Sequence, residues 1–322
     1  MRIVFAGTAD FAVPSLRACN ARHHVLAALT QPARPGSRGR PAPRPVADAA
    51  AQLGIPLLQP ERIRSGPVVE ELLGLGADVL VVAAYGQILP RTLLDGHRFG
   101  GVNVHASLLP RWRGAAPIAR AVLAGDPSAG VCIMRMEAGL DTGPVYATRE
   151  VPVDAEATAA GLTETLAIAG AEELVAVLAA LERGTAVATP QPEDGVTYAV
   201  RLTREDGLLD WSARTAEEVD RMVRALTPWP GVTADLAGVG VRILAGRPVP
   251  AVEVGVTPGE GDTVPGSAGA TPGLAGAIPG SVIRIEGESV LVATAAGLYR
   301  VDTLQPSGRR PMSAAAFLRG RK

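Results

Sequence analysis

Three polar side chains in the first half of the chain have the chemistry needed for acyl transfer. Asn103 and His105 lie two residues apart in the apolar run GVNVHAS, so on a strand they project from the same face. Asp141 follows a second apolar run, GVCIMRM, in a Gly-flanked segment. An amide can donate to a developing oxyanion, an imidazole can donate or move a proton, and a carboxylate can set the state of the imidazole. Because no G-x-S-x-G sequence is present, we expect direct transfer to an external nucleophile.

Each member of this set also has a purely structural explanation. His105 could be a hydrogen-bonded core histidine, and the Asp-Thr-Gly sequence at Asp141 is on its own more typical of an Asx-turn. The three side chains can meet only if the strand at 130–136 neighbours the strand at 101–107. A functional site therefore depends on how the surrounding elements are arranged.

The first half of the chain predicts alternating strands and helices. Segments with helical spacing separate five apolar runs, at residues 2–6, 24–30, 78–85, 101–107 and 130–136. This alternation predicts an α/β class domain with a Rossmann-like, mostly parallel sheet. Such sheets bind ligands at the carboxyl ends of their strands, where His105 is expected. A long helix at 158–183 should close the domain, which we place at residues 1–188.

The second half of the chain has a different pattern. A Pro/Gly/Asp-rich stretch predicts a linker over residues 189–207. Thr215 and Glu218 then form a capping-box sequence at the start of a helix. Short strands with turn punctuation follow and predict a small β-barrel, OB-like, within a second domain at residues 208–322. Within it, the Gly/Pro-rich residues 254–280 are expected to form a surface loop.

An arginine-rich loop is predicted over residues 31–46. It contains no acidic residue, and its basic residues are Arg34, Arg38, Arg40 and Arg44. The loop could be a solvated linker, but structureless loops of this length in compact domains are usually functional. Arginines on such an arm can bind phosphates, and small barrels often bind oligonucleotides. We therefore expect this loop to contact RNA.

Composition excludes several classes of protein. The 322 residues carry a formal net charge of −1, so any contact with nucleic acid must come from local basic patches. The two cysteines, Cys19 and Cys132, suggest core residues and no disulfide framework. No H-E-x-x-H or C-x-x-C spacing occurs, so no metal is expected. The N-terminus has no signal-peptide pattern and no apolar run is long enough to span a bilayer, so we expect a cytoplasmic protein without membrane contact.

Several stretches resemble the methionyl-tRNA formyltransferase family. In the first half these are FAGTADFAVPSL, AAYGQILP, NVHASLLPRWRGAAPI and GLDTGPVY. In the second half they are LTPWPGV and LQPSGRRPMSAAAFL. NVHASLLP and LDTG alone would indicate only the wider folate formyltransferase superfamily. The basic loop and the second domain narrow the resemblance to this family.

The resemblance implies transfer of the formyl group of 10-formyltetrahydrofolate to the α-amino group of methionyl initiator tRNA. The catalytic set it implies is Asn103, His105 and Asp141. The folate-binding stretch it implies is Ser107, Leu108, Leu109 and Pro110. The arginine loop would contact the tRNA, with Arg40 as the candidate for the main contact, and Trp112 and Arg113 could either pack under the site or contact RNA. A monomer is expected, although no sequence feature fixes the oligomeric state.

Two other functions are compatible with the same residues. A formyltransferase that acts on a small amine would share the catalytic set but would not need the arginine loop or the second domain. An RNA-binding protein on a degenerate enzyme fold would need those two features but no catalysis. Replacing Asn103 or Asp141 separates an enzyme from such a binding protein.

Overall fold

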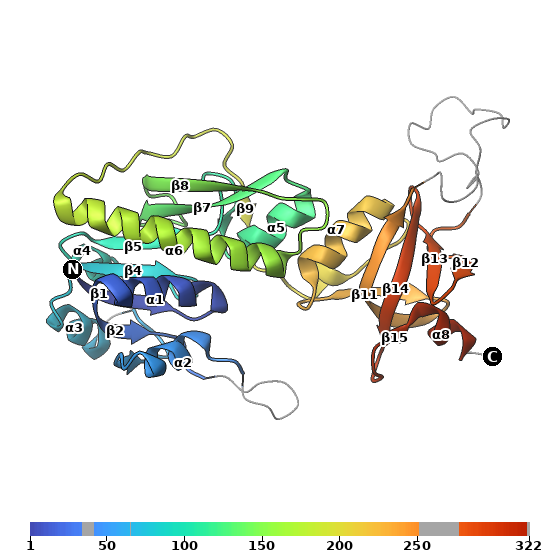
Figure 1. The fold of residues 1–322 in the computed structure, drawn as a ribbon, viewed down its shortest axis with the longest axis horizontal. Helices are drawn as coiled ribbons and strands as arrows, with labels where there is room; N and C mark the ends of the chain where they lie inside the picture. Colours follow the sequence, from blue (N-terminus) through green and yellow to red (C-terminus); the bar gives the residue numbers. More distant parts are fainter. Residues whose placement is uncertain (34–41, 65, 251–276, 321–322) are drawn as a thin grey trace. The chain divides into compact units, whose positions relative to one another are not determined.

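The computed structural model describes residues 1–33, 42–64, 66–250 and 277–320 (Figure 1). Two compact units make up the chain. The first comprises residues 1–121, 126–155 and 160–201. The second comprises residues 122–125, 156–159 and 202–322.

A seven-stranded sheet forms the centre of the first unit. Its strand order is β3-β2-β1-β4-β5-β7-β8. The strands are β1 (Arg2–Gly7), β2 (His24–Leu29), β3 (Leu57–Leu58), β4 (Val79–Ala83), β5 (Gly101–His105), β7 (Ser128–Arg135) and β8 (Val145–Pro152). The first five in this order run parallel, whereas β7 and β8 pair antiparallel at the edge beyond β5. The prediction of a mostly parallel α/β sheet is confirmed.

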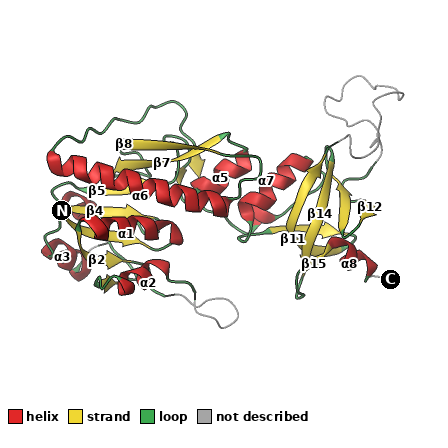
Figure 2. Ribbon diagram, viewed as in Figure 1, coloured by secondary structure: helices red, strands yellow, loops and turns green. Residues whose placement is uncertain are grey.

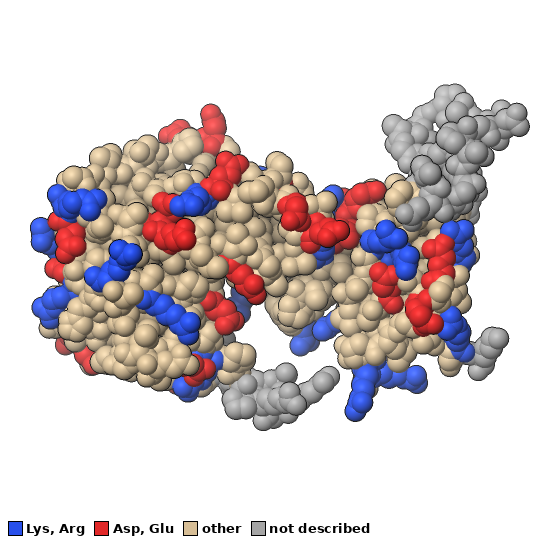
Figure 3. Space-filling model, viewed as in Figure 1, with Lys and Arg blue, Asp and Glu red and all other residues tan. Residues whose placement is uncertain are grey.

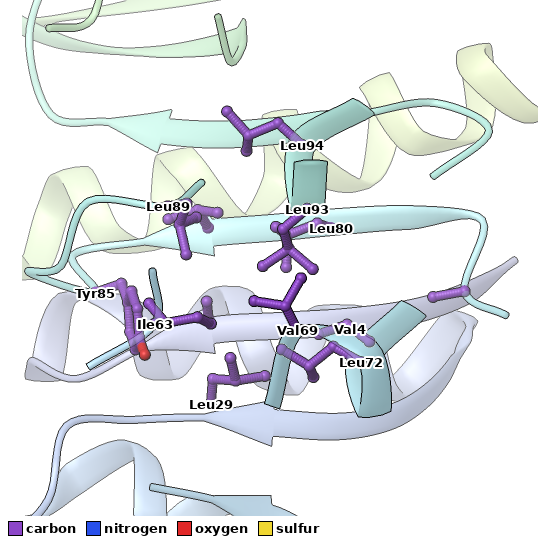
Figure 4. Close-up of a cluster of buried hydrophobic side chains, with 13 residues drawn as sticks. Val4, Leu29, Ile63, Val69, Leu72, Leu80, Tyr85, Leu89, Leu93 and Leu94 are labelled. Carbon is purple, nitrogen blue, oxygen red and sulfur yellow. The ribbon is translucent and has the colours of Figure 1, made fainter. Parts of the chain in front are cut away.

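Helices cover both faces of this sheet. They are α1 (Val13–Arg22), α2 (Pro45–Gln52), α3 (Pro67–Gly74), α4 (Arg91–Asp95), α5 (Pro117–Ala124) and α6 (Ala159–Arg183), with a short 3-10 helix at Asp10–Ala12. On one face, Leu72 of α3 and Leu93 of α4 pack with Leu80 of β4 in a buried apolar cluster (Figure 4). On the other face, α6 lies so close to the sheet that a Cβ on Gly170 would stand 2.7 Å from Val104. Gly170 therefore allows the close approach.

The second unit is built on an antiparallel sheet (Figure 2). Its strand order is β10-β11-β14-β13-β12, with β15 paired to β14. The elements are η3 (Glu205–Gly207), α7 (Ala216–Leu226), β10 (Val232–Leu236), β11 (Val239–Val249), β12 (Val282–Glu286), β13 (Ser289–Ala293), β14 (Leu298–Pro306), β15 (Met312–Ser313) and α8 (Ala314–Arg319). This arrangement confirms a small β domain after the α/β domain. Most of the predicted surface loop at 254–280 lies outside the described residues.

The start of α7 confirms the predicted capping box. The Thr215 hydroxyl accepts a hydrogen bond from the Glu218 amide, and the Glu218 carboxylate accepts one from the Thr215 amide. This reciprocal pair satisfies two amide groups that the first turn of a helix leaves without a partner. Such a cap contributes about 1 kcal/mol to stability.

Candidate active site

Asn103, His105 and Asp141 lie together at the carboxyl half of β5. The Asn103 amide nitrogen is 3.5 Å from Asp141 Oδ1, and His105 Nδ1 is 3.7 Å from Asp141 Oδ2. Asn103 and His105 are only 8% and 6% exposed, whereas the Asp141 side chain is 17% exposed. The amide, imidazole and carboxylate therefore share one partly solvent-accessible site, and their catalytic roles stay a prediction.

Asp141 reaches this site because its loop folds back along β5. β7 runs antiparallel to β5, so its last residue, Arg135, lies opposite Val102 near the start of β5. The loop 136–144 must return toward His105 before β8 begins. Asp141 has a φ of +52° within this loop, in the left-handed region that Asp tolerates better than most residues. A Cβ on Gly143 would collide with the Arg135 carbonyl oxygen, so the tight return requires glycine there.

Two groups from other segments bind Asp141. The Gly114 amide donates to Asp141 Oδ2 at 2.9 Å, from the short strand β6 (Arg113–Gly114). The Gln191 amide nitrogen donates to the backbone carbonyls of Asp141 and Gly143, at 2.8 and 2.7 Å. Sequence reasoning did not select Gly114 or Gln191, because nothing in their local pattern relates them to Asp141.

The hydrogen bonds of His105 indicate which ring nitrogen can take a proton. His105 Nε2 lies 3.1 Å from the carbonyl oxygen of Trp112. A carbonyl only accepts hydrogen bonds, so Nε2 carries the hydrogen. In the neutral imidazole Nδ1 is then unprotonated, and it faces the Asp141 carboxylate. This arrangement suits Nδ1 to accept a proton, and it leaves the oxyanion contact to the amide of Asn103.

Trp112 and its neighbour Arg111 are bound to one carboxylate of the same unit. The Trp112 indole N–H donates to Asp126 at 2.7 Å, and Arg111 makes two hydrogen bonds to Asp126, at 2.9 and 2.6 Å. The Arg111 guanidinium also stacks 4.3 Å from the centre of the Trp112 ring. The pair with Asp126 raises the pKa of Arg111. These contacts favour packing beside the site over RNA contact for Trp112.

The stretch predicted to hold folate folds over the start of β7. Ser107 is 3% exposed, and its hydroxyl donates to the Arg111 carbonyl at 2.7 Å. The side chain of Leu108 lies over Gly130 of β7, where a Cβ would collide with it. Leu109 is joined to Pro110 by a cis peptide bond. Folate binding by Ser107–Pro110 stays a prediction.

Cavities open among the described residues of the first unit, and two of them are relevant to the position of the site. The larger, about 680 Å³, includes Leu94, Phe99 and the residues Met136–Ala138 that lead into the Asp141 loop. The other, about 510 Å³, is lined by residues such as Gln31, Arg62 and Gln87 near the carboxyl ends of β2 and β4. Both volumes are within the range of small-molecule sites. Neither cavity is lined by the stretch Ser107–Pro110.

The structure describes only one of the four loop arginines. Arg34, Arg38 and Arg40 lie outside the described residues. Arg44 stands at the start of α2, with a guanidinium nitrogen 3.9 Å from the Asp48 carboxylate. On the face shown in Figure 3, basic and acidic side chains are interspersed on both units. The predicted RNA contact of this loop stays a prediction.

Two features are absent from the described part of the chain. No group of three or more His, Cys, Asp or Glu residues there could hold a metal ion. Among the same residues, no helix has both the length and the apolar character to cross a bilayer. Cys19 and Cys132 are buried and unpaired by disulfide, as expected for core residues.

Comparison with solved structures shows the same fold at low sequence identity. HypX from Aquifex aeolicus, in complex with tetrahydrofolic acid, matches 99% of this chain and 47% of its own, with a TM-score of 0.60 and 20% identity. WlaRD, a sugar 3N-formyl transferase, matches 96% of this chain and 99% of its own, with a TM-score of 0.64 and 14% identity. At these identities the likeness shows the fold alone.

Comparison with known sequences identifies the family. The formyl transferase family matches residues 1–178, and the formyl transferase C-terminal domain family matches residues 201–322. The methionyl-tRNA formyltransferase of Gluconobacter oxydans is 45% identical over 323 residues, which cover 99% of this chain and 97% of the relative. That of Xanthomonas axonopodis pv. citri is also 45% identical, over 100% of this chain and 98% of the relative. This chain therefore belongs to the methionyl-tRNA formyltransferase family.

Proposed function

We propose that this protein transfers the formyl group of 10-formyltetrahydrofolate to the α-amino group of methionyl initiator tRNA. The observation that carries the proposal is the meeting of Asn103, His105 and Asp141 at one site in a chain of this family. The reaction serves translation initiation, so we expect the protein to act in the cytoplasm. Folate and the charged tRNA are its two substrates.

The site residues have distinct roles in this reaction. As the amine attacks the formyl carbon and the new C–N bond forms, Asn103 donates a hydrogen bond to the oxygen that becomes negative. His105 Nδ1 accepts the proton that leaves the amine, and the Asp141 carboxylate stabilises the resulting imidazolium. His105 then gives the proton to the folate nitrogen as the old C–N bond breaks. Each turnover therefore ends with His105 neutral and no atom left on the protein.

The larger cavity opens at the amino end of β5, and the loop that carries Asp141 connects it to the site. Its wall combines the aromatic rings of Phe99 and Tyr146 and the apolar Leu94 and Met136 with a larger polar and charged set, Arg91, Asp95, His97, Arg98, Arg135 and Glu137. Such walls suit a flat heterocycle with ring N–H groups. The segment Met136–Ala138 links the cavity directly to the Asp141 loop. The proposal that Ser107–Pro110 binds folate rests on the family resemblance, because this stretch lines neither cavity.

The central experiment is a formylation assay with purified protein. We expect rapid formylation of methionyl initiator tRNA with 10-formyltetrahydrofolate as donor, and none without the donor. Small amines, such as free methionine or an amino sugar nucleotide, serve as alternative acceptors. Formylation of the small amines with no activity on the tRNA would contradict the proposal.

A specific observation keeps the small-amine function as a second candidate. The N-formyltransferase of Helicobacter canadensis, solved in complex with folinic acid and dTDP-3-aminofucose, shares the fold over 94% of this chain, with a TM-score of 0.65. At 14% identity that likeness does not transfer its acceptor to this chain. The arginine loop and the second domain favour the tRNA, and the assay above distinguishes the two acceptors.

The arginine loop gives a separate test of tRNA recognition. Replacing both Arg38 and Arg40 with Ala should raise KM for the tRNA about 10-fold or more and should reduce the salt dependence of binding, because each phosphate contact releases counterions. Turnover at saturating tRNA should change little. The double replacement of Arg17 and Arg22 on the surface of α1 is the matched control. An unchanged KM for the tRNA in the loop variant would mean that Arg38 and Arg40 do not contact the tRNA.

A further inference from the structure

Gln191 lies at the centre of the contacts that hold the Asp141 loop. Its amide nitrogen donates one hydrogen bond to the Asp141 carbonyl and one to the Gly143 carbonyl, at 2.8 and 2.7 Å. Gln191 is 50 residues away from Asp141 in the sequence, within the stretch predicted as a linker. One amide thus bridges two carbonyls of the turn that carries the catalytic carboxylate.

The other end of the Gln191 side chain is fixed as firmly. Its amide oxygen accepts two hydrogen bonds from the Arg113 guanidinium, at 3.1 and 2.7 Å. A guanidinium only donates and a carbonyl only accepts, so a single amide orientation satisfies all four contacts. The residue after Arg113 is Gly114, whose amide donates to the Asp141 carboxylate. Gln191 therefore couples the backbone of the Asp141 loop to the strand that binds its side chain.

The same connecting segment also holds the partner of His105. The Trp112 amide donates to the Thr197 hydroxyl at 2.8 Å, and the Arg113 amide donates to the Thr197 carbonyl at 2.9 Å. β6 pairs with β9 (Tyr198–Ala199) just beyond. Trp112 provides the carbonyl that accepts from His105 Nε2. Residues 191–199 therefore support both the imidazole and the carboxylate, although they lie outside the sheet that carries Asn103 and His105.

The conformation of Asp141 explains why such support is needed. A residue other than glycine in the left-handed region costs about 1 kcal/mol or more and persists only where its surroundings hold it. The Asp141 side chain receives one short hydrogen bond, from Gly114, and longer contacts with Asn103 and His105. Its backbone direction is set by the two hydrogen bonds from Gln191. Loss of those bonds would let the turn relax and move the carboxylate.

We infer that Gln191 is a positioning residue for the transfer reaction, which holds the Asp141 carboxylate at His105 through the backbone of the loop. The inference rests on the proposed function for its kinetic consequences. It assigns a part in the reaction to a residue between the two segments that match the family, 1–178 and 201–322, where the sequence predicted only a linker.

The decisive variant is Gln191→Glu, which keeps the shape and the acceptor for Arg113 but removes both N–H donors. We expect kcat to fall by on the order of 10- to 100-fold, because displacement of a reacting group by about 1 Å has an effect of that size. KM for both substrates should stay within about 2-fold. Gln52→Glu is the matched control, since Gln52 also accepts from an arginine, Arg17, at 3.3 Å, but on the surface of α1 and α2. Wild-type turnover in Gln191→Glu would overturn the inference.

A double-mutant cycle distinguishes positioning from general support of the fold. If Gln191 acts through the Asp141 carboxylate, Gln191→Glu should lower single-turnover rates less than about 2-fold in an Asp141→Asn background. An equal loss of rate in both backgrounds would mean that Gln191 does not act through Asp141, and the inference would fail. The proposed function would still hold if the wild-type protein formylates the tRNA.

Hydrogen exchange provides a readout that needs no activity. The Gly114 amide is bonded to Asp141, so its exchange should quicken at least about 10-fold in Gln191→Glu and stay at the wild-type rate in Gln52→Glu. This result would support the inference even if the wild-type protein formylated neither acceptor. Unchanged exchange at Gly114 in both variants would overturn it.

Discussion

β4 and β5 are parallel neighbours with the same pattern of burial but opposite chemistry. In their register Leu80 lies beside Gly101 and Val82 beside Asn103. All five residues of each strand are buried. Leu80 and Val82 belong to the apolar cluster under α3 and α4, whereas β5 presents a glycine, an amide and an imidazole to the same side. One strand completes the core on this face, and its neighbour interrupts it.

The contrast between the two strands shows where polar groups can be buried in a parallel sheet. A buried amide or imidazole is costly unless it is hydrogen-bonded, by about 1–3 kcal/mol for each group. Among the described residues, no side chain of the sheet is a hydrogen-bond partner of Asn103 or His105. Their partners are Asp141 and the carbonyl of Trp112, which arrive on loops from elsewhere in the chain. Side chains of β4 should therefore matter for stability and those of β5 for catalysis.

The largest effect is expected from Asn103→Ala. Loss of one hydrogen-bond donor to a developing oxyanion typically lowers kcat by about 10²–10³-fold, or about 2.7–4 kcal/mol in the barrier. tRNA affinity should stay close to that of the wild type, because Asn103 is 8% exposed and has little surface to offer RNA. Steady-state kinetics and filter binding measure the two quantities. A kcat close to that of the wild type would mean that Asn103 has a structural role and does not stabilise the oxyanion.

Val82→Ala is the matched change on the neighbouring strand. Removal of two buried methyl groups should lower the free energy of unfolding by about 2 kcal/mol, from lost burial and a small cavity. Because Val82 contributes no polar group to the site, kcat per folded molecule should be unchanged at a temperature where the variant is folded. Chemical denaturation and the formylation assay test both statements. A fall in kcat as large as that of Asn103→Ala would contradict the assignment of β4 to stability and β5 to catalysis.

The smallest effect concerns His97, in the connection from α4 to β5. His97 is 6% exposed, its Nδ1 lies 3.2 Å from the Ala77 carbonyl, and its Nε2 has no partner among the described residues. Burial lowers the pKa of His97 from its ordinary value of 6.5. As the pH falls, the unfolded chain therefore binds a proton at this histidine before the folded protein does. The free energy of unfolding keeps its full value above about pH 6.5 and declines below it.

Replacing His97 should make stability less sensitive to acid. One proton can contribute at most about 1.4 kcal/mol for each pH unit, so the difference between wild type and His97→Gln is a small one. Thermal unfolding at pH 7, 6 and 5 should show a smaller loss of Tm in the variant. Charged groups of the same cavity, Arg91, Asp95, Arg98, Arg135 and Glu137, remain in both proteins. Parallel pH profiles for the two proteins would mean that His97 does not couple folding to protons.

Much of the first unit could be predicted from local patterns. Apolar runs separated by helical spacing located β1, β2, β4, β5 and β7, and the capping box located the start of α7. The two-residue spacing of Asn103 and His105 put both side chains on one face, because alternate residues of a strand share a face in any fold. Such properties depend on neighbours in the sequence, so one sequence is sufficient to predict them.

Contacts between distant segments complete the site. The antiparallel direction of β7, the return of the Asp141 loop along β5 and the contacts of Gln191 and Thr197 join groups 27 to 85 residues apart. No local sequence pattern relates Gln191 to Asp141, which lies 50 residues away. The hydrogen bond between them depends on where the two segments pack. It places no requirement on the residues that surround either partner in the sequence. Local sequence specifies which chemical groups are available and on which face of β5 two of them lie. The packing of distant segments determined which of those groups meet.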